Sequence, residues 1–251
     1  MSNVGPTPLT HPERPLLCIV PALNEALTIT AVLDDLHAEC PYADVVVIDD
    51  GSTDATREVA LSAGARVARM PFNVGIGGAV QTGLIWARDH DYAMAVQVDG
   101  DGQHVAAEIA TLVETAQASG ANVIIGSRFL DDTSGFKSTA ARRSGMRVLA
   151  WLVSVLSGER FTDTTSGFRL YDRRAIEFLC TNYPEDYPEV EAILALRRAH
   201  FSVVEVQVTM RERGGGRSSI TPLRSVYYML KVTLALFVEM LRRKPKETPA
   251  Q

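Results

Sequence analysis

The chain has 251 residues, of which 46% are hydrophobic and 22% charged, and its net charge is −5. This composition is that of a globular protein with one large or two small domains, and it excludes a collagen-like or wholly disordered chain. The three cysteines form no Cys-x-x-Cys pair, so neither a disulfide framework nor a zinc cluster is expected, and a reducing cytoplasm is favoured.

Residues 1–15 are polar and rich in proline, and we expect them to form a disordered lead. They lack the apolar core of a signal peptide, and no run of 18 apolar residues occurs anywhere in the sequence. We therefore expect no membrane-spanning helix.

Strand and helix patterns alternate between residues 16 and 126. This alternation predicts an open, mostly parallel sheet with helices on both faces. Strands are predicted at Leu16–Ala22, Asp44–Ile48, Ala65–Met70, Tyr92–Val98 and Ala121–Gly126. Helices are predicted at Glu25–Glu39, from a Ser52 or Thr53 cap to about Ala63, at Gly75–Arg88 and at Val105–Ser119.

The pattern is less regular after Arg128. The predicted elements are a polar loop at Asp131–Thr139, a helix at Arg142–Leu156, a turn and extended segment at Thr162–Asp172, a helix at Val190–Ala199, a strand at Ser202–Met210, a basic loop at Arg213–Ser219 and a helix at Pro222–Arg243. We predict one domain over residues 16–220, followed by an amphipathic helix and basic tail over residues 221–251.

Charge is distributed unevenly along the chain. Residues 211–251 carry nine Lys/Arg and three Glu, a net charge of +6, which leaves −11 for the preceding residues. The acidic body disfavours nucleic-acid binding, whereas the basic tail suits an anionic membrane surface. Lys231 and Glu239 interrupt the last helix, so we expect it to lie on a membrane, to pack against a second copy in a homo-oligomer, or to fold back on its own domain.

Polar motifs follow three of the predicted strands, at Pro21–Glu25, Asp49–Asp54 and Asp99–His104. Ligands of open α/β sheets bind beyond the carboxyl ends of the strands, so these motifs are expected to meet in one site.

Asp99 and Asp101 flank Gly100, which lets the backbone turn both carboxylates toward one cation. Oxygen ligands suit Mg²⁺ or Mn²⁺, which can also neutralise a diphosphate leaving group. Gln103 can add a further oxygen, and His104 is expected to support the site without binding the metal. The alternative is an acidic turn that binds no metal.

Asp49 and Asp50 are placed to accept hydrogen bonds from a nucleotide base or ribose. The alternative role for Asp50, and for Ser52 or Asp54, is helix capping. The Gly75-x-Gly77-Gly78 sequence is similar to a phosphate-binding loop, but it lacks the lysine of a P-loop and equally suits a closely packed helix start.

Taken together, the motifs resemble those of family 2 glycosyltransferases with the GT-A fold, and most closely the branch of dolichol- and polyprenyl-phosphate sugar synthases. The resemblance covers about residues 16–220. The motifs that carry it are Pro21-Ala22-Leu23-Asn24-Glu25, Val47–Asp54, Asn73-x-Gly75-x-Gly77, Asp99–His104, Gly126-Ser127-Arg128 and Ser166-Gly167-Phe168-Arg169.

The resemblance implies a Rossmann-like α/β fold and an inverting transfer of sugar from a nucleotide-diphosphate sugar to a polyprenyl phosphate. It also implies Mg²⁺ or Mn²⁺ as cofactor, a place on the cytoplasmic face of the cell membrane, and a role in cell-envelope glycan or glycoconjugate synthesis. Neither the sugar nor the base of the donor follows from it.

The resemblance also assigns residues. Donor contacts are implied for Pro21, Leu23, Asn24, Glu25, Asp50, Gly77, Gln81 and Asp99, although the family often has tyrosine in place of Leu23. The implied metal ligands are Asp99, Asp101 and Gln103. Catalytic roles are implied for Asp101, Arg128 and Asp163.

The assignment of acceptor-binding residues rests partly on the chemistry of a lipid phosphate. A lipid phosphate needs no general base, but it needs cations to hold it near the anomeric carbon. The resemblance assigns acceptor binding to Arg128, Arg143, Ser166, Arg213 and Ser218, with a surface ion pair as the alternative role of each arginine and Arg142 as an alternative to Arg143.

Two other functions remain open. A glycosyltransferase acting on a glycan or small-molecule hydroxyl would need a carboxylate base, for which Asp163, Glu189 and Glu191 are candidates, although Asp163 better suits ordering the acceptor loop. A non-catalytic subunit that binds nucleotide-sugar is disfavoured by the intact Asp99 and Asp101. Nucleotidyl transfer is disfavoured because Pro21–Glu25 replaces the basic glycine-rich loop of such enzymes.

Overall fold

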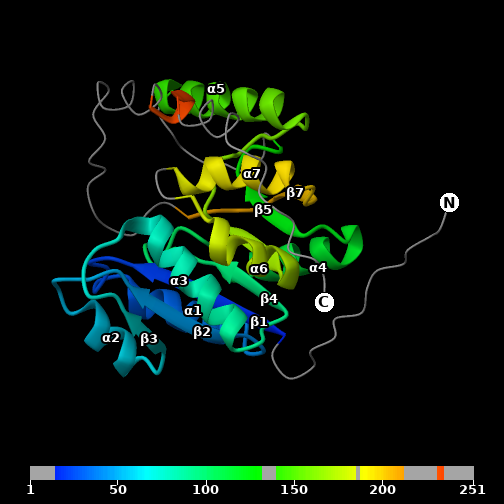
Figure 1. Cartoon of the computed structure of the whole chain (residues 1–251). Coiled ribbons are helices and arrows are strands. Elements are labelled where there is room, and N and C mark those ends of the chain that lie inside the picture. The colour runs from blue at the N-terminus through cyan, green and yellow to red at the C-terminus, as the bar shows by residue number, and fades with distance from the viewer. Residues whose placement is uncertain (1–14, 132–139, 185–186, 212–230, 235–251) are drawn as a thin grey trace.

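A seven-stranded sheet forms the centre of the molecule (Figure 1). The computed structural model describes residues 15–131, 140–184, 187–211 and 231–234. The strands are β1 Leu16–Ala22, β2 Asp44–Asp49, β3 Arg66–Arg69, β4 Met94–Gln97, β5 Val123–Ser127, β6 Arg169–Asp172 and β7 Val203–Gln207. The helices are α1 Ile29–Glu39, α2 Thr56–Ser62, α3 Gly75–Asp89, α4 Glu108–Ser119, α5 Ala140–Ser157, α6 Arg173–Asn182 and α7 Pro188–Arg198.

The strand order is β3-β2-β1-β4-β6-β5-β7. Strand β1 pairs in parallel with β2 and β4, β2 with β3, and β5 with β7. Strand β6 is antiparallel to both of its neighbours, β4 and β5. The predicted mostly parallel sheet is therefore confirmed, with β6 as the strand that runs the other way.

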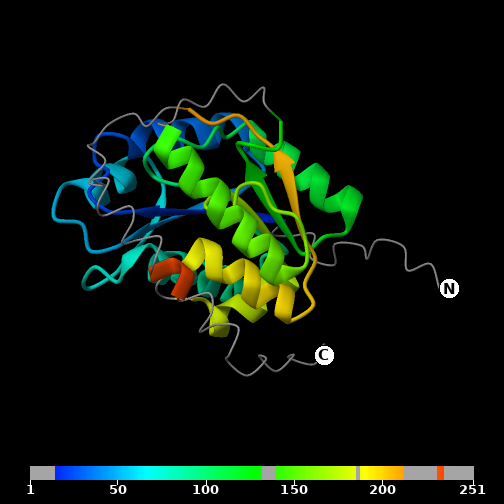
Figure 2. The same cartoon turned by 90° about the horizontal axis from the view of Figure 1, so that it is seen from above.

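Helices cover both faces of the sheet, and each face has its own apolar core (Figures 1 and 2). Side chains of β1 alternate between the two cores, because successive residues of a strand point to opposite faces. Leu17 and Ile19 pack with α3, α5, α6 and α7, whereas Leu16, Cys18 and Val20 pack with α1, α2 and α4. Burial of β1 on both faces explains its unbroken apolar sequence.

Several boundaries differ from the predicted ones. Helix α1 begins at Ile29 instead of residue 25, and α2 begins at Thr56, so a cap at Ser52 or Thr53 was wrong. Helix α6 was not predicted. Asp172 ends β6 and its carboxylate also accepts a hydrogen bond from the backbone N–H of Ala175 (2.7 Å), so strand and helix follow each other without a loop.

The predicted C-terminal helix falls mostly outside the described residues, as do the predicted loop at 213–219 and most of the predicted loop at 131–139. Residues 231–234 are helical, and Val232 is buried in the core beside α5 and α7. This turn therefore packs on the domain itself. Within the described ranges, no helix is both long enough and apolar enough to cross a membrane.

Candidate active site

A cavity of about 460 Å³ lies where the chain order of the strands reverses, between β1 and β4. Open α/β sheets bind ligands at such switch points, because the loops from neighbouring strands diverge there. All three polar motifs contribute to its walls, as the sequence predicts. The lining residues include Pro21, Leu23, Glu25, Asp50, Asp99 and Asp101.

Asn24 holds the first two motifs together without lining this cavity. Its backbone adopts a positive φ of 56°, and its backbone N–H donates to Ser52 Oγ at 3.0 Å. Its side-chain oxygen accepts from the backbone N–H of Thr53 at 2.9 Å. Asn24 thus fixes the loop after β1 against the loop after β2, and its predicted direct contact with the donor has no support in this geometry.

Asp50 joins the cavity to the start of α3. Its carboxylate accepts hydrogen bonds from the backbone N–H groups of Val74 (2.7 Å) and Gly75 (3.0 Å). The first N–H groups of a helix have no partner within the helix, and a carboxylate satisfies them well. Asp50 therefore caps α3, not α2, while still lining the cavity.

The Asp99 carboxylate is held in place by Gln97 and by the close approach of Gly167. Its Oδ1 accepts a hydrogen bond from Gln97 Nε2 at 3.0 Å, and its side chain keeps 33% of its area exposed. Gly167 packs so closely that a Cβ there would lie 3.2 and 3.3 Å from the two Asp99 oxygens. A Cβ on Gly100 would lie 3.1 Å from the carbonyl oxygen of Pro21, so a small residue is needed here too.

Asp101 lies beside Asp99 on the cavity wall. Its Oδ1 accepts a hydrogen bond from the backbone N–H of Gln103 at 3.0 Å, across Gly102 with a φ of 78°. The Gln103 side chain does not line this cavity, so its predicted role as a metal ligand has no support in this geometry.

The carboxylate ligands that Asp99 and Asp101 offer suit a hard divalent cation. No group of three or more His, Cys, Asp and Glu side chains that could hold a metal ion occurs in the part of the chain that the structure describes. Mg²⁺, however, is typically bound through one or two carboxylates together with substrate phosphates and water. Asp99 and Asp101 supply two such carboxylates on a cavity open to a ligand.

His104 holds the loop that carries Asp99 in place. Its ring stacks on Phe168, with centroids 4.7 Å apart. The backbone N–H of Asp99 donates to His104 Nδ1 at 3.0 Å, so the ring proton is assigned to Nε2, which faces Asp99 Oδ2 at 3.6 Å. Burial lowers the pKa of His104, while the charges of Asp99 and Asp101 act in the opposite direction. The neutral ring is therefore favoured.

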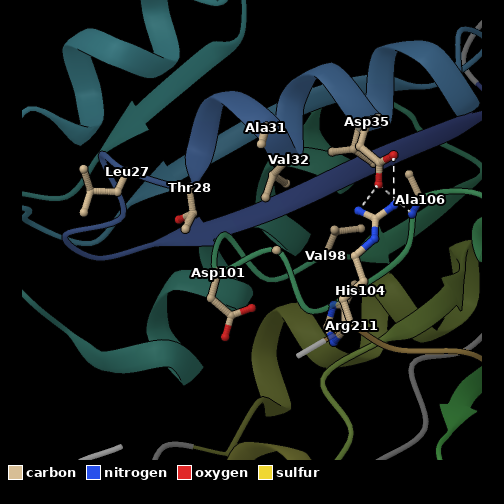
Figure 3. Close-up of a pocket in the computed structure, with 12 residues that line it drawn as sticks. Leu27, Thr28, Ala31, Val32, Asp35, Val98, Asp101, His104, Ala106 and Arg211 are labelled. Carbon is tan, nitrogen blue, oxygen red and sulfur yellow. Dashed lines mark hydrogen bonds and ion pairs between the residues drawn. The ribbon is translucent and has the colours of Figure 1, made fainter. Parts of the chain in front are cut away.

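A second cavity, of about 300 Å³, shares the Asp101 wall (Figure 3). Asp35 of α1 and Arg211 form an ion pair across it, with Arg211 Nη1 at 2.9 Å from Asp35 Oδ2. The backbone N–H of Arg211 also donates to the carbonyl oxygen of Gln103 at 2.8 Å, and that of Ala106 to Asp35 Oδ2 at 3.2 Å. The segment after β7 is thereby fixed to the loop that carries Asp101.

Arg128 and Asp163 form a buried ion pair. Arg128 Nε and Nη2 donate to the two Asp163 oxygens at 2.6 and 2.7 Å, and the backbone N–H of Arg128 donates to Oδ2 at 3.1 Å. Arg128 Nη2 also donates to Thr165 Oγ1 at 3.0 Å. This geometry supports the interpretation that Asp163 orders the loop, and a carboxylate engaged in this way is poorly placed as a base.

Glu205, which the sequence analysis missed, orders the same turn. Its carboxylate accepts hydrogen bonds from the backbone N–H groups of Thr162 and Asp163, each at 2.7 Å. Burial raises the pKa of Glu205, and the hydrogen bonds partly offset this rise. An isolated Glu in the middle of a strand gives no sequence signal for such a role.

Arg169 holds the loop that contains Ser166. Its guanidinium is buried and donates to the carbonyl oxygens of Ser166 (2.8 Å) and Thr164 (3.1 Å), and its Nη1 has no hydrogen-bond partner among the described atoms. Burial raises the pKa of Glu189, with Arg169 lowering it and Asp99 raising it further, so Glu189 lies within electrostatic range of both. Ser166 itself is buried and its Oγ accepts from the backbone N–H of Phe168 at 3.2 Å.

Gly77 and Gln81 lie on α3 away from the cavity lining. A Cβ on Gly77 would lie 3.0 Å from the carbonyl oxygen of Pro184, and Gln81 Nε2 donates to the carbonyl oxygen of Cys180 at 3.0 Å. Both residues pack α3 against its neighbours, so the geometry gives no support to their predicted donor contacts. Arg213 and Ser218 lie outside the described residues, as does the side chain of Arg143.

The sheet and its covering helices match a fold that is known from solved structures. The structure is similar to the crystal structure of glucosyl-3-phosphoglycerate synthase from Mycobacterium tuberculosis in complex with Mn²⁺ and UDP-glucose, with a TM-score of 0.67 and 22% identity over 91% of this chain and 79% of that chain. At this identity the likeness shows the fold alone, which is the GT-A fold of glycosyltransferases.

The family model described as glycosyl transferase family 2 matches residues 17–179, and the chain therefore belongs to family 2 of the glycosyltransferases. It is 31% identical to the polyprenol monophosphomannose synthase of Mycolicibacterium smegmatis, over 92% of this chain and 90% of the relative. It is also 32% identical to glycosyltransferase AglJ of Haloferax volcanii, over 95% of this chain and 75% of the relative.

Proposed function

We propose that this glycosyltransferase moves a sugar, with inversion, from a nucleotide-diphosphate sugar to a polyprenyl phosphate at the cytoplasmic face of the cell membrane. The observation that carries the proposal is the placement of Asp99 and Asp101 on the wall of the switch-point cavity. The relative named polyprenol monophosphomannose synthase, which matches nearly the whole chain, supports a lipid phosphate as acceptor.

The two halves of the proposed site meet at His104. The carboxylates of Asp99 and Asp101 act to raise its pKa and the guanidinium of Arg128 acts to lower it, so all three lie within electrostatic range of one ring. A donor bound beside the carboxylates would thus have Arg128 nearby, and an anionic acceptor would have to share its guanidinium with Asp163.

The proposed reaction is a single displacement. An oxygen of the lipid phosphate attacks the anomeric carbon, the bond from that carbon to the diphosphate oxygen breaks, and the nucleoside diphosphate leaves with the bonding electrons. A bound Mg²⁺ or Mn²⁺ would neutralise charge on the diphosphate. Asp99 and Asp101 would hold this cation, Asp50 and Glu25 would contact the nucleoside, and no residue needs to remove a proton.

The test measures transfer of labelled sugar from a panel of nucleotide-sugars to polyprenyl phosphate, as label extracted into organic solvent. Asp99→Asn and Asp101→Asn should each lower transfer at least about a hundredfold, because charge on the leaving group is no longer compensated. The control Asp89→Asn removes an exposed carboxylate at the far end of α3 and should leave transfer unchanged. Full activity of either site variant would contradict the assignment.

A second candidate is transfer to a hydroxyl group, for which Glu189 is the base to test, although it lines neither of the two cavities. Burial raises the pKa of this carboxyl, as expected of a general base, and Glu189 lies within electrostatic range of Asp99. Glu189→Gln separates the two functions. It should leave transfer to polyprenyl phosphate largely intact, whereas loss of a base would lower transfer to a hydroxyl acceptor about 10²–10⁴-fold.

A further inference from the structure

Helix α5 carries an apolar ridge that faces solvent. Val148, Trp151 and Val155 are 56%, 65% and 59% exposed. Their spacing of three and four residues places them on one face of the helix, over a length of about 10 Å. The opposite face is already buried, since Leu149 and Val153 belong to the apolar core. A helix at the surface normally presents polar side chains on its outer face, so this ridge needs an explanation.

The ridge stands in basic surroundings. Helix α5 contains Arg142, Arg143 and Arg147 and no acidic residue. Arg147 is exposed next to Val148, and Arg160 is exposed shortly after the helix ends. The nearest acidic side chain in sequence, Glu159, is paired with Arg197 of α7. The exposed side of α5 therefore combines an aromatic and two aliphatic side chains with the exposed Arg147, and no ion pair of Arg147 or Arg160 occurs among the described residues.

Helix α5 lies at the outside of the molecule, where a flat surface can reach it (Figures 1 and 2). It packs on α7 and follows Arg128 along the chain, with residues 128–139 between β5 and the helix. The ridge is thus on the element that comes next in the chain after the proposed acceptor-binding arginine.

We propose that the ridge of Val148, Trp151 and Val155 docks the enzyme on an anionic lipid bilayer. Tryptophan is enriched at membrane interfaces, where its apolar ring enters the acyl boundary and its N–H remains near the headgroups. Arginines beside it attract anionic headgroups. This inference rests on the proposed function, because a polyprenyl phosphate acceptor is delivered from such a bilayer.

The same observations disfavour a second copy of the chain as the occupant. A two-fold interface brings the same patch of both subunits together, which would place one basic helix against another. Three apolar side chains also fall far short of a standard interface, which buries about 800 Å² on each partner. An anionic surface complements the positive charge beside the ridge, whereas a second copy of the chain does not.

Tryptophan fluorescence offers a direct test, because the chain has only two tryptophans. Trp86 is partly buried and stacks on His90 at 4.4 Å. In the Trp86→Phe variant, Trp151 is the only reporter, and its emission should shift to shorter wavelength when phosphatidylglycerol vesicles are added. The shift should weaken in vesicles of phosphatidylcholine alone and at high salt, because the arginines no longer contribute.

Flotation with the same vesicles tests the ridge itself. Trp151→Ser should lower the vesicle partition coefficient at least about tenfold, the loss expected when one large apolar side chain no longer leaves water. Leu61→Ser is the matched control, since Leu61 is a 48% exposed apolar residue on α2, on the opposite face of the sheet. This control should float as well as the unchanged protein, and circular dichroism should show that both variants are folded.

Three results would overturn the proposal. The first is an emission wavelength of Trp151 that does not change when vesicles are added. It could stay long in both conditions, or it could already be short in buffer because another part of the chain covers the ridge. The second is undiminished flotation of Trp151→Ser. The third is a dimer in sedimentation experiments that Trp151→Ser dissociates, which would make a second copy the occupant.

Activity separates this proposal from the proposed function. With a short-chain polyprenyl phosphate that dissolves in water, Trp151→Ser should retain the turnover of the unchanged protein, and with long-chain acceptor in vesicles its turnover should fall. If vesicle binding behaves as expected but no polyprenyl phosphate accepts sugar, the proposed function fails and the docking surface stands. If soluble acceptor is used but the vesicle experiments fail, only the docking surface is wrong.

Discussion

Gly167→Ala tests the geometry of the proposed metal site with a single methyl group. A Cβ at this position would lie 2.8 Å from Gln97 Nε2 and 3.2 and 3.3 Å from the two Asp99 oxygens. Gln97 Nε2 is also the donor to Asp99 Oδ1, so the methyl group displaces both members of one hydrogen bond. The Asp99 carboxylate must then move by several tenths of an ångström.

The size of the effect follows from two terms. Overpacking of a close contact costs about 1–3 kcal/mol of folding free energy. For a chain of this length, that cost lowers the melting temperature by about 2–12 °C. Mg²⁺ demands oxygen ligands at about 2.1 Å in near-ideal geometry, so a displaced carboxylate weakens its binding. A loss of about 1.4 kcal/mol corresponds to a tenfold lower affinity for the cation.

The assay is titration of the purified protein with Mn²⁺, followed by electron paramagnetic resonance in the presence of a nucleoside diphosphate. Gly83→Ala serves as the control, because a Cβ there would collide with Ile19 Cγ2, within the core between α3 and β1. We expect both variants to lose stability and only Gly167→Ala to lose Mn²⁺ affinity. Unchanged affinity of Gly167→Ala would refute the role given to Asp99, and an equal loss in both variants would show that the effect is not local.

Asp163→Ala should lower the free energy of unfolding by about 3–5 kcal/mol, because it removes the carboxylate that pairs with the buried guanidinium of Arg128. Denaturant unfolding would show this, and the double variant Arg128→Met/Asp163→Leu should lose much less; equal losses would contradict the buried-pair argument. The thiols of Cys18, Cys40 and Cys180 are buried, and burial raises the pKa of Cys180 to about 11. At pH 8 only about one in a thousand Cys180 thiols is then ionised, so alkylation of the native protein should be far slower than after unfolding, and rapid native labelling seen by mass spectrometry would contradict the burial.

Much of the fold follows from the sequence up to residue 126, because buried parallel strands produce unbroken apolar runs and polar turns separate them. The position of β6 does not follow. Its four residues carry no mark of their partners, and pairing between Gln97 and Arg169 is decided by contacts far apart in the chain. Helix α6 escaped prediction because Asp172 serves as both the end of β6 and the cap of the helix, so no loop separates them.

The same limit applies to the site. The carboxylates on the cavity wall were predictable, since ligands of open α/β sheets bind beyond the carboxyl ends of the strands. The residues that hold these loops in place were not predictable. Glu205 reaches the turn at Thr162 from a strand 43 residues away, and His104 stacks on Phe168, which is also distant in the chain. Gly77 shows the opposite error, since a glycine needed for packing gives the same sequence signal as one that faces a phosphate.

The insertion of β6 between β4 and β5 has a consequence for how the chain reaches this structure. Strands β1, β2, β3 and β4 pair with one another directly, so the walls of the larger cavity are complete once residue 101 has been made. Strands β4 and β5 have no contact in the ladder until Arg169–Asp172 fills the gap, and β5 must then find β7 with Val123 opposite Val203, 80 residues away. Closing such a loop is slow, because its entropy must be lost before the pairing is gained. During synthesis the half of the sheet that carries Asp99 and Asp101 can therefore assemble early, whereas the half that carries Arg128 waits for nearly the whole domain to emerge.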